Sequence, residues 1–454
     1  MRRQIAIDMV HGPLLGKILL FSLPLMMSNI LQLLFNAVDI VVVGRFSGYG
    51  SLAAVGSTSS IIYLCTNLLI GISVGVNVMV ARYLGVGQNE KEISQIVHTS
   101  AFVALADGTA LGIIGILAAD WILNLISTPA DIYDLTLLYL RIYFVGTPFV
   151  MLYNYGAAAL RAMGDTRRPL LYLTISGVVN LVLNLFFVVI LCIDVAGVAV
   201  ATVLSQVLSA GLIIRCLAGA QDAFRFSWRQ MRMDWRTFRG LAYVGIPAGI
   251  QACLFSLSNV TIQGAINSYG SIVMAGSSAA ASIEAFVYTS MNSFHQAAQT
   301  FISQNIGAGH YDRISRVFRL CMACTVILGL LETCVLVLAS PHLISIYNSD
   351  PAVIVQGTLR LHVAGTMYVI YGMADVLIGA IRGYGIPIVP VIINFLGACA
   401  FRIVWIQLLD TAKYAVEYVY LSYPVSWVII LVALGIFWLL LRRKERCTCS
   451  QAQE

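Results

Sequence analysis

The sequence predicts an all-α polytopic membrane protein with twelve transmembrane helices in two pseudo-symmetric six-helix lobes. Three observations carry this prediction: the apolar excess, the number of apolar stretches and an internal repeat. Of the 454 residues, 59% are hydrophobic and only 11% are charged, and the mean hydropathy is +0.87. Soluble domains carry roughly 45–50% apolar and about 25% charged residues, so this chain lacks the polar surface that water requires. We therefore expect it to reside in a bilayer.

Twelve apolar stretches, bounded by Gly, Pro and charged residues, are long enough to span a membrane. A spanning helix needs about 20 apolar residues, so little of the chain is left for a soluble domain. We expect the spans near residues 17–43, 52–80, 95–118, 133–160, 169–191, 195–218, 241–266, 273–300, 318–339, 353–381, 386–408 and 418–441.

The basic residues predict the orientation of these spans. With the N-terminus inside, 22 of the 27 Lys and Arg residues fall at the inner termini, helix ends and loops. The outer loops hold only Arg45 and Lys413. This asymmetry follows the positive-inside rule and predicts a plasma (inner) membrane protein with both termini in the cytoplasm. Because the basic residues fill short gaps between spans, we expect no nucleic-acid partner.

The longest inner connection has a pattern of its own. Aromatic residues and one methionine recur there at helical spacing, and each is followed directly by an arginine. These residues are Phe224, Trp228, Met231, Trp235 and Phe238, with Arg225, Arg229, Arg232, Arg236 and Arg239. On a helix they form an apolar stripe flanked by guanidinium groups, which suits the lipid headgroup layer. We expect an N-terminal lobe at 1–218, an interfacial amphipathic linker at 219–239, a C-terminal lobe at 240–441 and a cytoplasmic tail at 442–454.

The second half of the chain repeats landmarks of the first half at offsets between 219 and 223 residues. The pairs are Pro24 and Pro247, 85–87 and 307–309, Arg141 and Arg360, 161–164 and 382–385, and Pro169 and Pro390. Five pairs in the same order indicate two homologous lobes. Because each lobe has an even number of spans, both insert with the same orientation and bracket a central cavity. Such an architecture predicts transport by alternating access.

Polar side chains inside the spans are the functional candidates, because an ionisable group in hydrocarbon is costly. In the first lobe, Gln32, Asn36 and Asp39 share one face of a helix. Asn180 and Asn184 share a face of the fifth span, and Asn154 and Thr202 lie on the spans that flank it. These residues predict a hydrogen-bonded site around Asp39.

The second lobe carries its own acids. Asp375 follows Tyr371 by one helical turn, and Glu284 lies near the middle of the eighth span. Asp107 and Glu332 have fewer polar neighbours. Arg402 lies within the eleventh span, where we expect it to bind a carboxylate or helix carbonyls rather than substrate.

Buried acids can exchange a proton across a membrane, and a carboxylate with amide oxygens can also hold Na⁺. Either chemistry supports antiport, in which the coupling ion and a cationic cargo compete for one carboxylate. The candidates for ion coupling are Asp39, Asn180, Asn184, Thr202, Glu284, Tyr371 and Asp375, and those for substrate binding are Gln32, Asn36 and Asn154. An ion site for Na⁺ would use Asp375, Tyr371 and Glu284. We expect no cofactor.

Several of these motifs resemble the multidrug and toxic compound extrusion (MATE) transporters. The stretch from Phe21 to Gly44 is similar to that family's first-helix signature, and 161–166 and 304–309 are similar to its inner-loop signatures. The resemblance implies two six-helix bundles in a V shape that export amphipathic, often cationic compounds against H⁺ or Na⁺. It also implies that Asp39 is the protonation site of the first lobe and that Tyr371 and Asp375 form the cation site of the second.

Two departures limit this transfer. One branch of the family has an aspartate where this chain has Asn184, which leaves Asp39 as the main acid of its lobe. Another branch has a glutamate eight residues after the proline that matches Pro247, where this chain has Phe255. The second-lobe ion site is then incomplete unless Glu284 substitutes. These departures favour H⁺ over Na⁺.

Two other function classes are weaker alternatives. A flippase for a lipid-linked oligosaccharide, from the same superfamily, would be expected to carry cationic residues for a pyrophosphate, whereas the candidates here are acids and amides. An intramembrane enzyme would need convergent catalytic groups, and the six histidines are scattered along the chain. We therefore expect a monomeric transporter whose partners are a small amphipathic molecule and membrane lipid.

Overall fold

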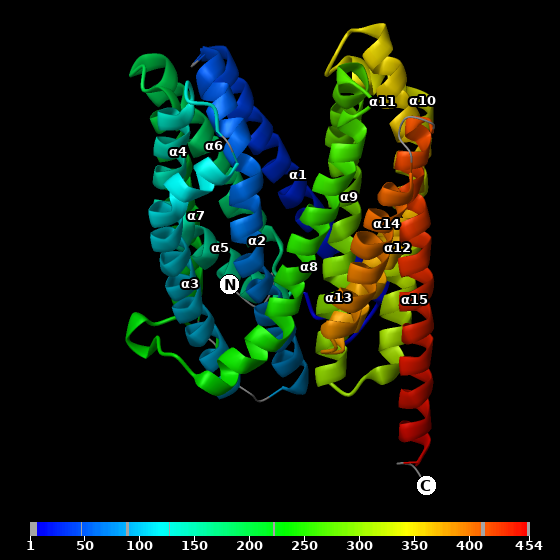
Figure 1. Ribbon diagram of the computed structural model, residues 1–454. Coiled ribbons are helices and arrows are strands. Elements are labelled where there is room, and N and C mark those ends of the chain that lie inside the picture. Colours follow the sequence, from blue (N-terminus) through cyan, green and yellow to red (C-terminus); the bar gives the residue numbers. More distant parts are fainter. Residues whose placement is uncertain are drawn as a thin grey trace. The chain divides into compact units, whose positions relative to one another are not determined.

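The computed structural model consists of helices joined by short connections (Figure 1). It describes residues 7–46, 48–87, 90–126, 128–220, 223–409 and 414–451, and no strand occurs in these ranges. Lys413 of the predicted outer loop lies outside the described residues. The α-helices are α1 (Leu14–Phe46), α2 (Gly48–Val86), α3 (Glu90–Leu125), α4 (Tyr133–Val145), α5 (Thr147–Ala162), α6 (Arg167–Leu185), α7 (Asp194–Ala218), α8 (Trp235–Asn267), α9 (Ser271–Gly307), α10 (Tyr311–Ser345), α11 (Pro351–Val363), α12 (Tyr368–Gly383), α13 (Ile388–Asn394), α14 (Phe401–Leu408) and α15 (Val416–Gln451). Four short elements complete the order: π-helices η1 (Phe186–Ile190) and η4 (Phe395–Ala400), and 3₁₀-helices η2 (Trp228–Gln230) and η3 (Gly365–Met367).

The all-helical prediction with twelve spans is confirmed. Among the described residues, 11 helices are long and apolar enough to cross a membrane, and the bent pair α4–α5 brings the number to 12. The pair bends by 44° at Gly146. Pro148 lies in the first turn of α5, and because it has no N–H group the helical hydrogen bonds of α4 cannot continue through it. Each predicted apolar stretch overlaps one of these spans.

Packing divides the chain into two compact units. Unit 1 comprises Met1–His11, Leu23–Gly249 and Gly307–Gly309, and unit 2 comprises Gly12–Ser22, Ile250–Ile306 and His310–Glu454. The start of α8 belongs to unit 1 and the rest of α8 to unit 2. The lobe boundaries inferred from the repeat stay a prediction, because the units are defined by packing alone.

Glycines explain why α8 begins in unit 1. A Cβ atom on Gly71 of α2 would lie 2.4 Å from the backbone nitrogen of Gly249, and one on Gly75 would lie 2.2 Å from the carbonyl oxygen of Leu241. No side chain fits at such distances, so α2 and α8 touch backbone to backbone. Close contact through small residues is the usual way in which membrane helices associate.

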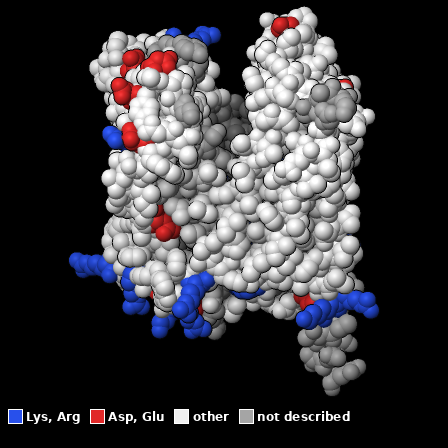
Figure 2. All heavy atoms as spheres, in the orientation of Figure 1, with Lys and Arg blue, Asp and Glu red and all other residues white. Residues whose placement is uncertain are grey.

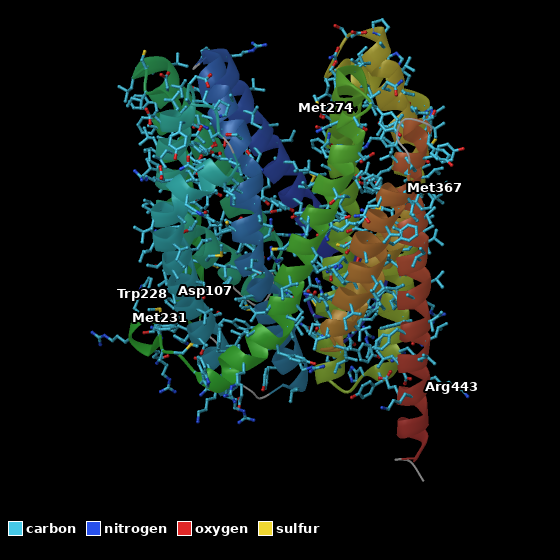
Figure 3. All side chains as sticks on the ribbon, viewed as in Figure 1. Asp107, Trp228, Met231, Met274, Met367 and Arg443 are labelled. Carbon is cyan, nitrogen blue, oxygen red and sulfur yellow. The ribbon has the colours of Figure 1, made fainter. Side chains whose placement is uncertain are left out.

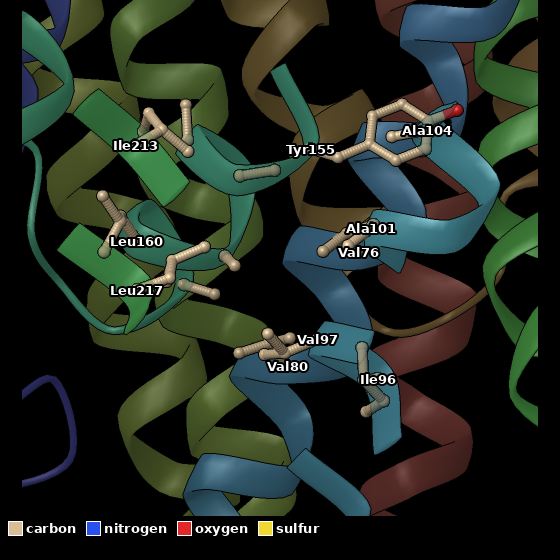
Figure 4. Packing of buried hydrophobic residues seen from close by; sticks show 14 of the residues in the cluster. Val76, Val80, Ile96, Val97, Ala101, Ala104, Tyr155, Leu160, Ile213 and Leu217 are labelled. Atoms are coloured by element: carbon tan, nitrogen blue, oxygen red, sulfur yellow. The ribbon is translucent and has the colours of Figure 1, made fainter. Parts of the chain in front are cut away.

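The two units have different cores. The core of unit 1 is built mostly from small aliphatic side chains of α2, α3, α5 and α7, such as Val76, Val97 and Ile213 (Figure 4). A cluster in unit 2 is richer in aromatic residues and includes the buried side chains of Tyr420 and Trp427. Aromatic rings bring polar atoms and π-faces into the apolar interior, where they can contact buried guanidinium groups.

The linker prediction is wrong in its secondary structure. Instead of an amphipathic helix over residues 224–238, the chain forms the three-residue η2, and α8 begins at Trp235. Backbone N–H groups that a helix would use internally bind elsewhere: Phe226 donates to the carbonyl of Leu217 at 3.1 Å, and Ser227 donates to Nε2 of His98 at 3.0 Å. Phe226 is buried and stacks on the ring of His98, whereas Trp228 is exposed (Figure 3).

Charged side chains gather toward the ends of each unit (Figure 2). Most Lys and Arg atoms visible on either unit lie at one end, and in unit 1 most of the visible acidic atoms lie toward the other end. In unit 2 this basic end includes the last turns of α15, which continues as a helix into the predicted tail (Figure 3). There Arg442 pairs with Glu445 and donates to Ser315 Oγ at 2.7 Å. Which of these ends faces the cytoplasm stays a prediction from the positive-inside rule.

Candidate functional site

The first polar cluster lies in unit 1, where α1, α6 and α7 meet. Asn184 of α6 donates from Nδ2 to Oδ1 of Asp39 at 2.6 Å. The same nitrogen donates to Oδ1 of Asn180 at 3.1 Å, and Asn180 Nδ2 lies 3.5 Å from the hydroxyl oxygen of Thr202. The structure thus brings together the four residues that the sequence proposed for ion coupling in this half.

This cluster is buried at one end and accessible at the other. Asn184 is fully buried and Asn180 nearly so, whereas Asp39 is only half-buried. Gln32 and Asn36, the predicted substrate residues on α1, are exposed. Asp39 therefore separates a buried amide network from an accessible polar face of α1.

Asn154, the third predicted substrate residue, is half-buried on α5. Its side chain donates to the carbonyl of Val150, one turn earlier on its own helix, at 2.8 Å. No hydrogen bond of the described network links it to Asp39. The structure therefore places Asn154 apart from the cluster that the sequence proposed.

The second polar cluster lies in unit 2, between α9 and α12. Nδ1 of His295 lies 2.7 Å from the carbonyl oxygen of Asp375 and 3.0 Å from its Oδ1. Asn292 donates from Nδ2 to Oδ2 of Asp375 at 3.0 Å, and Gln296 donates to Asn292 Oδ1 at 3.0 Å. His295 and Asp375 are both buried, and Asn292 is half-buried.

Glu284 does not complete this cluster, contrary to expectation. Its carboxylate accepts two hydrogen bonds from Arg360 of α11, at 3.1 Å from Nε and 2.7 Å from Nη2. Arg360 also donates to Ser277 Oγ at 2.6 Å, and both charged side chains are almost fully buried. A bidentate buried pair of this kind occupies the carboxylate oxygens. Glu284 is therefore a structural partner of Arg360.

Tyr371 belongs to an aromatic cluster in unit 2. Its ring centroid lies 5.5 Å from that of Trp427, 5.6 Å from Tyr288, 5.9 Å from Phe255 and 6.1 Å from Tyr368. The cluster contains Phe255, which stands where one branch of the family has a glutamate. Aromatic contacts replace the acid there, so Asp375 meets nitrogen donors and rings rather than a second carboxylate.

The remaining charged side chains within the spans have separate partners. Asp107 of α3, labelled in Figure 3, accepts a hydrogen bond from the hydroxyl of Tyr155 at 3.1 Å. Glu332 of α10 accepts one from Ser290. Neither acid joins one of the two clusters.

Arg402 meets neither a carboxylate nor a helix carbonyl as its main partner. Its Nε donates to Ser426 Oγ at 2.8 Å, and its guanidinium carbon lies 4.5 Å from the ring centroid of Tyr423. The side chain is fully buried, so its charge faces aromatic rings rather than water. The expectation that Arg402 is structural fits this environment, although its partners differ from those expected.

Sequence reasoning missed His295, Asn292 and the role of Arg360. A signal for the first two was present: Tyr288, Asn292, His295 and Gln299 recur along α9 at spacings of four, three and four residues. At these spacings the four side chains share one face of α9. The six histidines are scattered along the sequence, but His295 lies on this face.

Comparison with known proteins agrees with this architecture. The sequence profile of the MatE family matches residues 24–186 and 247–406, which correspond to the two halves of the internal repeat. The chain belongs to the MatE family. MatE proteins are transporters, so the chain is a multi-pass membrane transporter and not an enzyme.

Relatives and solved structures extend along nearly the whole chain. The probable multidrug resistance protein YoeA of Bacillus subtilis is 26% identical over 439 residues, which cover 94% of each chain. The probable multidrug resistance protein YpnP of the same organism is 27% identical over 399 residues, covering 87% of this chain and 88% of the relative. A crystal structure of MATE in the bent conformation matches with a TM-score of 0.87 at 18% identity, covering 96% of this chain and 97% of that structure. This MatE chain thus has the fold of solved MATE transporters. Its relatives include probable multidrug resistance proteins.

Proposed function

We propose that this MatE transporter exports small amphipathic, often cationic organic compounds across the plasma membrane in exchange for H⁺. Its relatives named as multidrug resistance proteins support the cargo class. The excess of basic residues at the predicted inner ends supports cytoplasmic termini. The proposed working unit is a monomer in contact with membrane lipid, because each polar cluster is built within one chain.

The bond between Asp39 and Asn184 is the single observation that carries the proposal. A half-buried carboxylate within a membrane span is costly as a free charge, and one amide donor at 2.6 Å offsets only part of that cost. Binding a proton or a cation removes the rest. A proton and a cationic cargo that compete for Asp39 cannot both be bound, and this exclusion converts inward proton movement into outward cargo movement.

The surroundings of both acids support H⁺ rather than Na⁺ as the coupling ion. Na⁺ binds to several oxygen ligands at once, as hard cations do. Asp39 faces the Nδ2 atom of Asn184, and both oxygens of Asp375 face nitrogens, from His295 and Asn292. Glu284, which would have supplied further oxygens, is held by Arg360. A proton needs a single oxygen or nitrogen, which these sites offer.

The test is ethidium transport by proteoliposomes in which a proton gradient and a sodium gradient are imposed separately. We expect transport under the proton gradient in Na⁺-free medium and none under the sodium gradient alone. Transport under the sodium gradient alone would replace H⁺ by Na⁺ in the proposal. Failure of both gradients in folded, inserted protein would contradict multidrug antiport and favour another cargo, such as a lipid-linked oligosaccharide.

A further inference from the structure

The polar cluster of unit 2 contains a histidine whose hydrogen atom can be placed from geometry alone. A backbone carbonyl oxygen only accepts hydrogen bonds, and that of Asp375 lies 2.7 Å from Nδ1 of His295. Nδ1 must therefore carry a hydrogen atom. In the neutral ring the other nitrogen, Nε2, is then the basic one. Any proton that His295 gains or loses is thus exchanged at Nε2.

Both oxygens of the carboxylate beside this ring face nitrogen donors. Oδ1 of Asp375 lies 3.0 Å from the Nδ1–H group of His295, and Oδ2 accepts from Asn292 Nδ2 at 3.0 Å. The orientation of the Asn292 amide is consistent, since its Oδ1 accepts from Gln296. A protonated carboxyl group would need an acceptor for its hydrogen atom. Both of these partners of Asp375 are donors, so they offer none. The proton of this imidazole–carboxylate pair, formed by His295 and Asp375, therefore resides on the ring.

Helix packing holds the imidazole–carboxylate pair in place. A Cβ atom on Gly379, one turn after Asp375 on α12, would lie 2.4 Å from the carbonyl oxygen of His295. A Cβ atom on Gly383 would lie 2.8 Å from the carbonyl oxygen of Gln299, one turn further along α9. The glycines let the two backbones approach closely enough for the ring to reach the backbone of Asp375.

Other charged and titratable groups surround the pair. Arg382 of α12 interacts electrostatically with Asp375 and with Tyr288 and Tyr371, and its Nη2 donates to Gln251 Oε1 of α8 at 2.8 Å. Tyr371 in turn interacts with Arg402 of α14. Two neighbouring helices contribute uncharged contacts to α12: Thr325 of α10 at Gly372 and Trp427 of α15 at Tyr371.

We propose that His295 is a second proton-carrying group of this transporter, with Asp375 as the carboxylate that orients and stabilises its imidazolium form. This inference rests on the proposed H⁺ antiport and assigns part of its coupling to unit 2. In the protonated state the imidazolium and the carboxylate neutralise each other. When Nε2 releases its proton to water, the ring becomes neutral and the carboxylate charge loses its nearest counter-ion. A cationic cargo then finds a site that is more negative by one charge, so cargo binding and proton release are linked.

The experiment measures protons released when a cation binds to purified protein. Tetraphenylphosphonium is added to protein in detergent, in weakly buffered Na⁺-free solution near neutral pH, with a pH-indicator dye and an independent measurement of the bound cation. The Asp39→Asn variant removes the contribution of unit 1. In this variant we expect about one proton released per cation bound, since one imidazole exchanges a single proton at Nε2.

The decisive comparison is Asp39→Asn against the double variant Asp39→Asn/His295→Gln. Glutamine keeps an N–H group that can donate to Asp375, and we expect the double variant to release at least about threefold fewer protons per cation bound. Equal proton release by the two proteins, both monodisperse, would overturn the inference. Asp39→Asn/Asp375→Asn leaves the ring in place and is an independent second variant, for which we also expect reduced release.

His98→Gln is the matched control. His98 is also buried, but both of its ring nitrogens have structural partners, the carbonyl of Ser94 and the N–H group of Ser227. We expect no change in proton release per cation bound. If wild-type protein releases protons and Asp39→Asn releases none, the role of His295 fails while the proposed antiport stands. If wild-type protein binds the cation without releasing protons, the proposed H⁺ antiport itself fails.

Discussion

The two units differ most in the place and the partners of their acids. At the repeat offsets, Asp39 of unit 1 corresponds to Ile262 of unit 2, and Asp375 of unit 2 corresponds to Asn154 of unit 1. His295 corresponds to Ser73. Each unit therefore has a polar centre at positions where the other unit lacks an acid.

The chemistry of the two centres differs as well. Asp39 is held by an amide network, whereas Asp375 is held by an imidazole and an amide. Glycines and prolines recur between the halves because they determine helix ends and close packing. The comparison teaches that the repeat sets the helical frame while each unit carries its own polar centre.

Removing the acid of unit 1 is the strongest way to break this comparison. Asp39→Asn keeps the shape of the side chain but cannot bind or release a proton at this position. We expect coupled ethidium efflux in proteoliposomes to fall at least about tenfold, because a coupling carboxylate within a span has no substitute nearby. Wild-type efflux by a folded Asp39→Asn protein would show that unit 1 is not the site of coupling.

The buried ion pair of unit 2 predicts the largest loss of stability. Arg360→Met leaves Glu284 buried without its partner, which costs about 3–5 kcal/mol in comparable pairs. We expect a marked loss of thermal stability in detergent. The double variant Arg360→Met/Glu284→Met removes both charges and should recover most of that loss. If the double variant is no more stable than Arg360→Met, the contacts of Arg360 with the aromatic rings matter more than the ion pair does.

The close contact between Gly379 of α12 and the backbone of His295 on α9 gives a further test of how unit 2 is packed. Gly379→Ala places a methyl group against the carbonyl of His295 and should destabilise unit 2 by about 1–3 kcal/mol, as overpacking does. Gly211→Ala is the control, because nothing lies within 4 Å of its added Cβ atom. Thermal unfolding of both variants in detergent checks this. Equal effects of the two substitutions would argue against a close α9–α12 contact.

The smallest effect is expected at the arginine of unit 1 that corresponds to Arg360. Arg141 is exposed, and the residue of unit 1 that corresponds to Glu284 is Ile62. Arg141→Gln should therefore change stability by less than about 0.5 kcal/mol. A loss comparable to that of Arg360→Met would mean that the two arginines have equivalent structural roles after all.

The fold could be predicted from the sequence because the bilayer imposes a simple rule. Every spanning segment must satisfy its own backbone hydrogen bonds, so apolar stretches of sufficient length become helices. The linker lies outside that rule. Its backbone binds to His98 and Leu217, and such tertiary partners leave no trace in the spacing of Phe226 and Trp228.

The candidate site was predictable only in part. Asn180 and Asn184 share one face of a single helix, so helical spacing predicted that they lie together, whereas the contact of Asn184 with Asp39 of α1 depends on helix packing. Glu284 and Arg360 are 76 residues apart, and their pairing depends on how α9 packs against α11. The contact between His295 and Asp375 depends likewise on a glycine that lets two helices approach. Spacing within one helix cannot reveal such contacts.

The most direct test of the central claim is whether a cargo gradient alone moves protons. Proteoliposomes containing a luminal pH dye, in Na⁺-free medium with the membrane potential clamped, receive ethidium on the outside. Empty liposomes and Asp39→Asn proteoliposomes are the controls. We expect wild-type protein to exchange entering ethidium for departing protons, so that the lumen becomes alkaline, at least about tenfold more slowly with Asp39→Asn and not at all in empty liposomes. Ethidium entry through the wild-type protein with no change in luminal pH would contradict proton antiport.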